Sequence, residues 1–209
     1  MIGSDRSATA QGDEAMLPDE QYLIRERILK ILGAAFHIYS HNGNLVGYCK
    51  QKPFRIKEDL RIYRSETCSH EMMLIKARNI VDFGATYEVT LPDGTLLGCF
   101  RRKGFTSSFM RAHWMVTDEH EREVGQLLEH GGTLTVLRRF LGPLCLLFPE
   151  TVVLSRTDDD TEIARFRTTR NLFTKSIGIS ILQDHPQLDE LLILAAGCLL
   201  CAFEKRDRS

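Results

Sequence analysis

The sequence lacks an excess of charge of either sign. Its 209 residues include 27 basic and 28 acidic side chains, which gives a formal net charge of −1. Proteins that bind nucleic acid over a broad surface are usually strongly basic, so no nucleic-acid partner is expected. The first residues also lack the apolar stretch of a secretory signal. We therefore expect residues 1–20 to form a disordered leader.

Cysteine is too sparse for a disulfide scaffold. Six cysteines are spread along the chain, whereas exported domains held by disulfides are shorter and richer in cysteine. We therefore expect reduced thiols and a cytoplasmic protein. If its partner is a lipid, we expect the protein to attach peripherally to a membrane. Hydrophobic residues make up 43% of the chain and charged residues 26%, which is ordinary for a folded domain and excludes disorder throughout.

The sequence also lacks the short motifs of common enzyme sites. It contains no GxSxG, P-loop, GxGxxG or HExxH pattern, so we expect a non-enzymatic protein without a cofactor. An enzyme with an unrecognised site is the remaining alternative. Solvated histidines explain His113, His120 and His130 better than a metal cluster does. The three aspartates at 158–160 fit a hairpin turn better than a Ca²⁺ site, because aspartate bonds to local backbone groups.

The longest hydrophobic feature is an uncharged run of thirteen residues, Leu191 to Phe203. A helix that spans a bilayer needs roughly 20 such residues, and a helix that is apolar all round is usually enclosed by protein. Asp189 and Glu190 suit the positive end of the helix dipole. We therefore predict a buried C-terminal helix, with a membrane-embedded helix as the alternative. The core residues expected on it are Leu191, Leu194, Ala195, Gly197, Cys198 and Cys201.

A CxxC pattern lies inside this apolar run, at Cys198 and Cys201. Structural zinc sites usually combine such a pair with a second pair of ligands, and none accompanies this one. Small residues on a buried helix face therefore explain the two cysteines better than a zinc or redox pair does.

An internal repeat occupies the first half of the chain. Residues 36–52 align without gaps to residues 87–103, and each copy contains a turn dipeptide, Asn42-Gly43 or Asp93-Gly94. Glycine in such dipeptides accepts a positive φ, which is typical of β-hairpins. The repeat therefore predicts two hairpins of the same kind in one antiparallel sheet.

Weaker copies of the hairpin follow at residues 114–125 and 150–169. An open sheet of about ten strands tends to curl or close, and closure around the apolar helix would bury both apolar surfaces. We therefore predict a mainly β fold, a closed antiparallel barrel with the C-terminal helix along its axis. A short helix is expected at residues 133–141, and residues 22–32 fit either a helix or a strand.

A series of short segments runs through the chain, at residues 22–27, 36–38, 42–46, 54–56, 60–62, 74–76, 86–89 and 93–94. In this order they resemble the LURP-one-related family. The terminal helix is similar to that of phospholipid scramblases and the tubby C-terminal domain. The resemblance covers residues 22–205 and implies a twelve-stranded closed barrel, with residues 22–32 as the first strand. We expect one domain over residues 21–205 and a polar tail at 206–209.

The resemblance implies two kinds of lipid chemistry. Tubby domains bind phosphoinositides, and scramblases are associated with calcium-dependent lipid movement through acidic residues before the terminal helix. In this chain residues 174–176 are Thr, Lys and Ser, which leaves Asp184 and Asp189 as weak metal candidates. A Ca²⁺ site requires about six to eight oxygen ligands, so no metal is assigned.

Basic residues are the remaining candidates for a binding site. If the segments that carry them are neighbours, they form a cationic patch suited to anionic lipid headgroups, and otherwise they belong to a solvated face. We expect binding of an anionic phospholipid or phosphoinositide, or of a protein partner. A scramblase-like protein whose terminal helix inserts into the bilayer is the alternative function. The candidate lipid-binding residues are Arg101, Arg102, Lys103, Arg111, Arg165 and Arg167.

Overall fold

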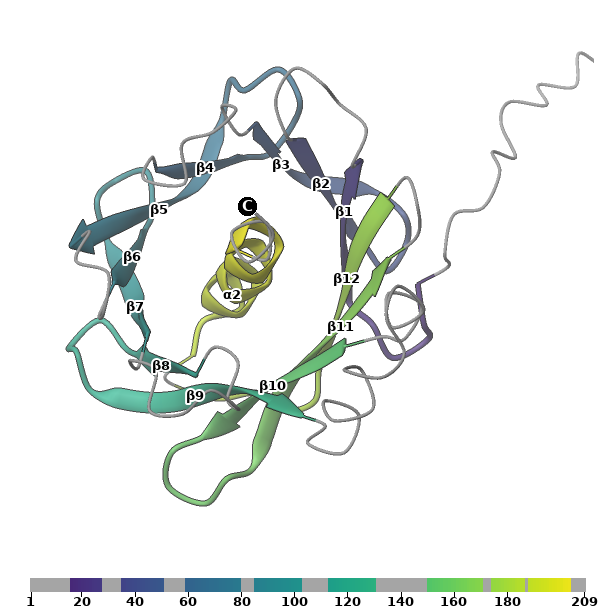
Figure 1. Cartoon of the computed structure of the whole chain (residues 1–209). Coiled ribbons are helices and arrows are strands. Elements are labelled where there is room, and N and C mark those ends of the chain that lie inside the picture. The colour runs from purple at the N-terminus through teal and green to yellow at the C-terminus, as the bar shows by residue number, and fades with distance from the viewer. Residues whose placement is uncertain are drawn as a thin grey trace, which may run out of the picture.

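The chain folds into a closed antiparallel barrel of twelve strands around a C-terminal helix (Figure 1). The computed structural model describes residues 16–27, 35–50, 59–79, 85–102, 113–130, 150–170, 174–186 and 188–203. Each strand pairs with the next one along the chain, and the first strand closes the barrel against the last. The predicted fold class, a mainly β barrel with a C-terminal helix along its axis, is confirmed.

The segment that fits either a helix or a strand in the sequence begins with a strand, because residues 22–26 pair on both sides within the sheet. Residues 28–32 lie outside the described residues, as does the helix expected at 133–141. The strands are β1 (Tyr22–Arg27), β2 (Ala35–Ser40), β3 (Leu45–Lys50), β4 (Leu60–Tyr63), β5 (Glu71–Asn79), β6 (Thr86–Thr90), β7 (Leu96–Arg102), β8 (Trp114–Thr117), β9 (Glu123–His130), β10 (Glu150–Arg156), β11 (Glu162–Arg170) and β12 (Thr174–Ile181), and the helix is α2 (Glu190–Phe203).

The repeat predicted from the sequence is present as two hairpins of the same geometry, β2–β3 and β6–β7. Gly47 and Gly98 occupy matching register positions, and the register shifts at the same point in both hairpins. The turn residues Gly43 and Gly94 have φ values of +77° and +89°. The prediction of positive φ at both turn glycines is confirmed.

The hairpin β8–β9 repeats this geometry with a different residue in the turn. Gly125 lies opposite Val116, and the register shifts directly after this pair, as in the two stronger copies. The position with positive φ is Glu121, at +61°. The turn is therefore maintained here without the glycine that marks it in the other two hairpins, which explains why this copy is weaker in the sequence.

Side chains alternate along each strand, and one row of them enters the barrel and contacts α2. A Cβ placed on Gly197 would lie 2.7 Å from Ile179 Cδ1 and 2.9 Å from Ile24 Cδ1, so the helix backbone lies directly against β1 and β12. Ala195 and Cys198 are fully enclosed, with 0% exposure. Because the wall surrounds the helix, the helix needs no polar face. The other predicted core residues are Leu194 and Cys201, which are buried, and Leu191, which is partly buried.

Polar groups hold both ends of α2. At the first turn, Asp189 Oδ1 accepts a hydrogen bond of 2.7 Å from the backbone N–H of Leu191, as an N-cap residue does. At the last turn, the buried Lys175 of β12 donates from Nζ to the carbonyl oxygens of Leu200 and Cys201, at 3.3 and 3.0 Å. A cation at the C-terminus complements the helix dipole. The barrel wall therefore fixes the position of the helix along the barrel axis.

The last residues of the expected leader contact the barrel. Leu17 to Glu20 form a turn, in which the backbone N–H of Glu20 donates to the carbonyl of Leu17 at 3.0 Å. Glu20 is 2% exposed. Residues 1–15 and the expected tail at 206–209 lie outside the described residues.

The turn residue Gly94 provides a test of the hairpin geometry. Replacing it with valine should lower the free energy of unfolding by about 1–2 kcal/mol, because a β-branched residue disfavours positive φ. Nothing lies within 4 Å of a Cβ at this position, so the cost comes from the backbone alone. Thr95→Val, at the next position, should cost less. Urea unfolding of both variants measures the difference, and equal stabilities would contradict the hairpin assignment.

Candidate anion-binding site

Two of the predicted basic residues lie together at the end of β7. Arg102 lies opposite Trp114, which is 4% exposed and belongs to the core, so Arg102 shares the inner face at this end of the barrel. Alternation along the strand places Arg101 on the outer face, where it is exposed. Lys103 and Arg111 lie outside the described residues.

The other two predicted residues, Arg165 and Arg167, lie on β11. Strands β8, β9 and β10 separate β11 from β7 in the barrel, so these arginines are not neighbours of Arg101. Arg165 donates from Nη2 to Glu162 Oε2, and Arg167 donates from Nε to Glu20 Oε1 at 2.8 Å. The structure therefore divides the described candidates into two separate places, and Arg165 and Arg167 are both engaged in ion pairs.

Most arginines on the outer wall are paired in this way with acidic side chains. Pairs of this kind in contact with water each contribute little to stability, about 0–1 kcal/mol, but they neutralise the local charge. The further pairs are Arg61 with Glu71, Arg78 with Glu88 and Glu121, Arg122 with Asp118, and Arg156 with Asp158 and Asp159.

Arg101 differs from these arginines, because it forms no ion pair within the part of the chain that the structure describes. Its charge still acts on its surroundings. The pKa of Glu121 is lowered by the hydrogen bond and the charge of Arg78 and, to a smaller extent, by the charge of Arg101. Arg101 is therefore an exposed cation beside a pair that is already neutralised, and an incoming anion can approach it.

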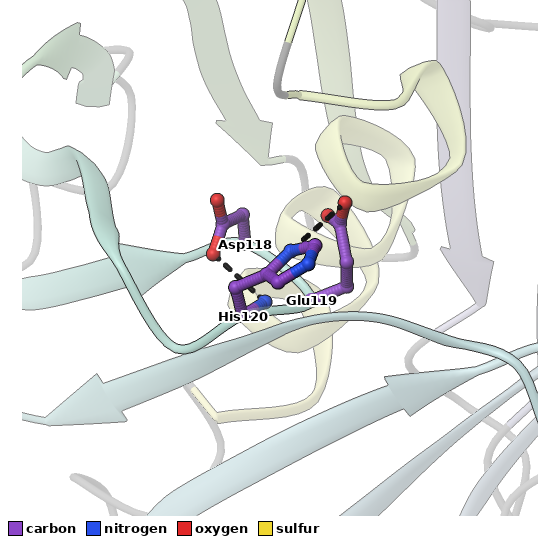
Figure 2. Close-up of side chains that lie close together, drawn as sticks. All are labelled: Asp118, Glu119 and His120. Carbon is purple, nitrogen blue, oxygen red and sulfur yellow. Dashed lines mark hydrogen bonds and ion pairs between the residues drawn. The ribbon is translucent and has the colours of Figure 1, made fainter.

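The side chains of Asp118, Glu119 and His120 form the candidate metal cluster of the described residues, with ligand atoms within 4.8 Å of one another (Figure 2). The buried Asp118 is already engaged. Its Oδ1 accepts hydrogen bonds of 2.9 Å from the backbone N–H groups of His120 and Arg122, and its Oδ2 accepts one of 2.8 Å from Arg122 Nε. Glu119 lies 3.3 Å from His120 Nδ1. The carboxylate of Asp118 therefore organises the β8–β9 turn. This role was not predicted from the sequence.

The metal candidates predicted from sequence do not come together. Asp189 caps α2, and Asp184 belongs to no group of potential ligands among the described residues. His113 precedes β8 and His120 follows it, so the two lie at opposite ends of that strand. The side chain of His130 is outside the described part of the chain.

The aspartates at 158–160 lie in the β10–β11 turn, as predicted. Asp159 Oδ1 accepts a hydrogen bond of 3.1 Å from the backbone N–H of Thr161, and Asp160 has a φ of +56°. Hydrogen bonds from Thr161 lower the pKa of Asp159. The local backbone therefore uses these carboxylates in the way that the turn interpretation requires.

The thiols inside the barrel are buried and favour the protonated form. Cys198 and Cys201 are both free and buried on α2, and Cys49 of β3 is free and buried in the wall. Burial raises the pKa of Cys198 well above its ordinary value, and it raises that of Cys49 as well. A thiol held in the protonated form is a poor nucleophile and a poor metal ligand.

None of the helices within the described residues has the length and apolar character needed to cross a membrane. This agrees with the position of α2 inside the barrel.

Comparisons with known proteins give a fold likeness only. No protein-family model matches the sequence, and no curated protein matches it. Among solved structures, the chain is similar to the X-ray structure of a protein from Arabidopsis thaliana, with 16% sequence identity and a TM-score of 0.45. The match covers 90% of this chain and 94% of the other. A likeness this distant carries no inference about family or function.

The buried carboxylate of Asp118 gives a prediction with a defined pH dependence. Burial raises its pKa, but hydrogen bonds from Arg122 and from the backbone of His120 outweigh burial and hold the pKa below its ordinary value. Asp118→Asn should therefore lower the free energy of unfolding at pH 7 by about 1–2 kcal/mol. A carboxyl with a lowered pKa stabilises the fold above its unfolded pKa of about 3.9, and this contribution disappears as the pH falls through the folded value.

The difference between wild type and Asp118→Asn should accordingly shrink as the pH falls from about 5 to about 3, which urea unfolding at several pH values measures. Glu119→Gln, which alters the exposed neighbour, is the matched control and should change stability little at any pH. A difference that stays constant across this range would show that the charge of Asp118 is not the source of the stabilisation.

Proposed function

We propose that the protein is a non-enzymatic β-barrel module of the cytoplasm that binds anionic phospholipid headgroups, phosphoinositides among them, through the end of β7. The observation that carries the proposal is the exposed Arg101, which forms no ion pair among the described residues, whereas Arg165 and Arg167 do. Arg102 follows at once in the strand, and Lys103 is the next residue in the sequence. Three cations therefore follow one another in the sequence, and the first two are the last residues of β7.

The filled interior supports a surface site. α2 occupies the barrel axis (Figure 1), and its enclosed side chains contact the inward-facing side chains of the wall. A ligand therefore has to bind on the outer wall or at the end of the barrel. The guanidinium group suits a phosphate because it offers parallel N–H donors in a fixed fork.

The expected affinity is modest. Each cation near an anionic membrane surface contributes about 1 kcal/mol, so three of them give a weak, reversible attachment. Exposed charges are screened over about 10 Å at 0.1 M salt, so binding should weaken as salt is added. This is the behaviour of a peripheral protein rather than of one inserted in the bilayer.

Two alternatives have less support. A scramblase-like protein with an inserted terminal helix would have to extract α2 from the barrel and leave its wall unfilled. With 14 residues, the helix is about 21 Å long, shorter than the roughly 30 Å of the hydrocarbon core. A protein partner at the same surface is the second candidate. The resemblance to the LURP-one-related family forms part of the proposal and is compatible with either a lipid or a protein partner.

Co-sedimentation with phosphoinositide-containing vesicles tests the proposal. Wild type should bind at low salt, and the triple charge reversal of Arg101, Arg102 and Lys103 to glutamate should weaken binding at least about a hundredfold, since three contributions of about 1 kcal/mol are lost. The matched control reverses three exposed cations elsewhere on the barrel, Lys50, Arg64 and Lys76, with the same change in net charge. The control should retain most of the binding.

The outcomes separate a site from a general electrostatic effect. Equal losses in both triple variants would show that only net charge matters. No binding of wild type at low salt, or equal binding by wild type and the β7 variant, would contradict the lipid proposal and leave a protein partner as the better hypothesis. Circular dichroism of each variant verifies that the barrel is folded.

A further inference from the structure

The outer wall of the barrel holds an acidic segment of the chain itself. Residues 17–21 directly precede β1 and contact β12, since the backbone N–H of Gln21 donates to the carbonyl of Ile179 at 2.9 Å. The side chain of Gln21 continues the contact, since its Oε1 accepts a hydrogen bond of 2.7 Å from the backbone N–H of Ile181. Gln21 thereby continues the pairing of β1 with β12, and the turn that precedes it lies against the barrel wall.

The two acidic side chains of the segment each have a partner on the wall. Glu20 Oε1 lies 2.8 Å from Arg167 Nε, and Asp19 Oδ2 accepts a hydrogen bond of 3.0 Å from Ser180 Oγ. His41 Nδ1 lies 3.0 Å from the carbonyl oxygen of Glu20. Together Arg167, Gly178, Ser180 and His41 form what we call the acidic-segment cradle.

Gly178 shapes the cradle. It lies directly opposite Arg167 in the β11–β12 register. A Cβ at this position would lie 1.9 Å from Glu20 Oε1, and the three nearest atoms that it would meet all belong to the Glu20 carboxylate. Gly178 is not among the glycines with positive φ, so its backbone does not require glycine. Glycine at this position is therefore explained by the space that it leaves for the Glu20 carboxylate beside Arg167, and not by the backbone conformation of a turn.

Polar contacts, rather than apolar ones, attach residues 17–21 to the barrel wall. Leu17, the large hydrophobic residue of the turn, is 41% exposed. The buried contacts come from the carboxylate of Glu20, which is 2% exposed, and from the hydroxyl of Ser180. An attachment made of hydrogen bonds and an ion pair exchanges with other anions, because a new acidic segment can reproduce each contact.

We propose that the acidic-segment cradle is a recognition site for an acidic peptide with adjacent aspartate and glutamate, and that residues 17–21 occupy it in cis as an intramolecular competitor. A partner protein that presents such a segment displaces residues 17–21 and lies along β12. The site is on β11–β12 and does not depend on lipid binding at β7. It also gives Arg167 a role other than the lipid contact expected from the sequence.

Peptide binding to the full chain tests this proposal. The probe is a capped synthetic peptide with the sequence of residues 16–21, titrated against wild type and against the double variant Asp19→Asn, Glu20→Gln. The amide resonances of Gly178 and Ser180 report binding at the cradle by NMR. We expect the peptide to bind the double variant at least tenfold more tightly than wild type, because a tethered segment competes at an effective concentration on the order of millimolar.

Two controls make the result specific. Adding Gly178→Ala to the double variant should abolish binding, because the new methyl group occupies the place of the carboxylate. The same peptide with Asn and Gln in place of Asp and Glu should not bind. The proposal is overturned by a folded double variant that gives no shifts, by equal binding of the uncharged peptide, or by retained binding with Gly178→Ala. A double variant that does not fold would also overturn it, since an exchangeable segment cannot be essential for the fold.

Discussion

The packing of an apolar helix against the inside of a closed sheet is the constraint on which this structure depends. The strands alone would enclose an empty apolar space, and the helix alone has no polar face with which to meet water. Each therefore requires the other, and Gly197 allows the two backbones to approach closely at β1 and β12. Lys175, buried in the wall, bonds to the last carbonyl groups of α2 and fixes where the helix ends.

The filled interior leaves the outer wall and the barrel ends as the places where this protein meets other molecules. Ion pairs neutralise several of the described arginines on that wall, whereas Arg101 is exposed and forms no ion pair among the described residues. The proposed site at β7 centres on the exposed Arg101, whereas the slot beside Gly178 has room for a single carboxylate. The two surfaces differ in shape as well as in position, and they are compatible with two different partners.

Local chemistry predicts the architecture well and the sites poorly. The repeated turn dipeptides and the uncharged run at 191–203 were sufficient to predict hairpins, closure and a central helix. The sequence could not show that three strands separate Arg101 from Arg165 in the barrel. The contact of Glu20 with Arg167 joins residues 147 positions apart and leaves no periodic signal. The role of Asp118 was also not predicted, because the turn that its carboxylate organises has no glycine to mark it in the sequence.

Hydrogen exchange of α2 tests the central claim most directly, with and without vesicles that contain anionic lipid. If the helix is the core of the barrel, the amides from Ala195 to Cys198 should exchange only through global unfolding, and vesicles should not change their protection. Fast exchange of these amides in the free protein would show that the helix is not packed inside the sheet. Protection that changes selectively in α2 when vesicles are added would show that the helix leaves the barrel for the bilayer, and would contradict the account.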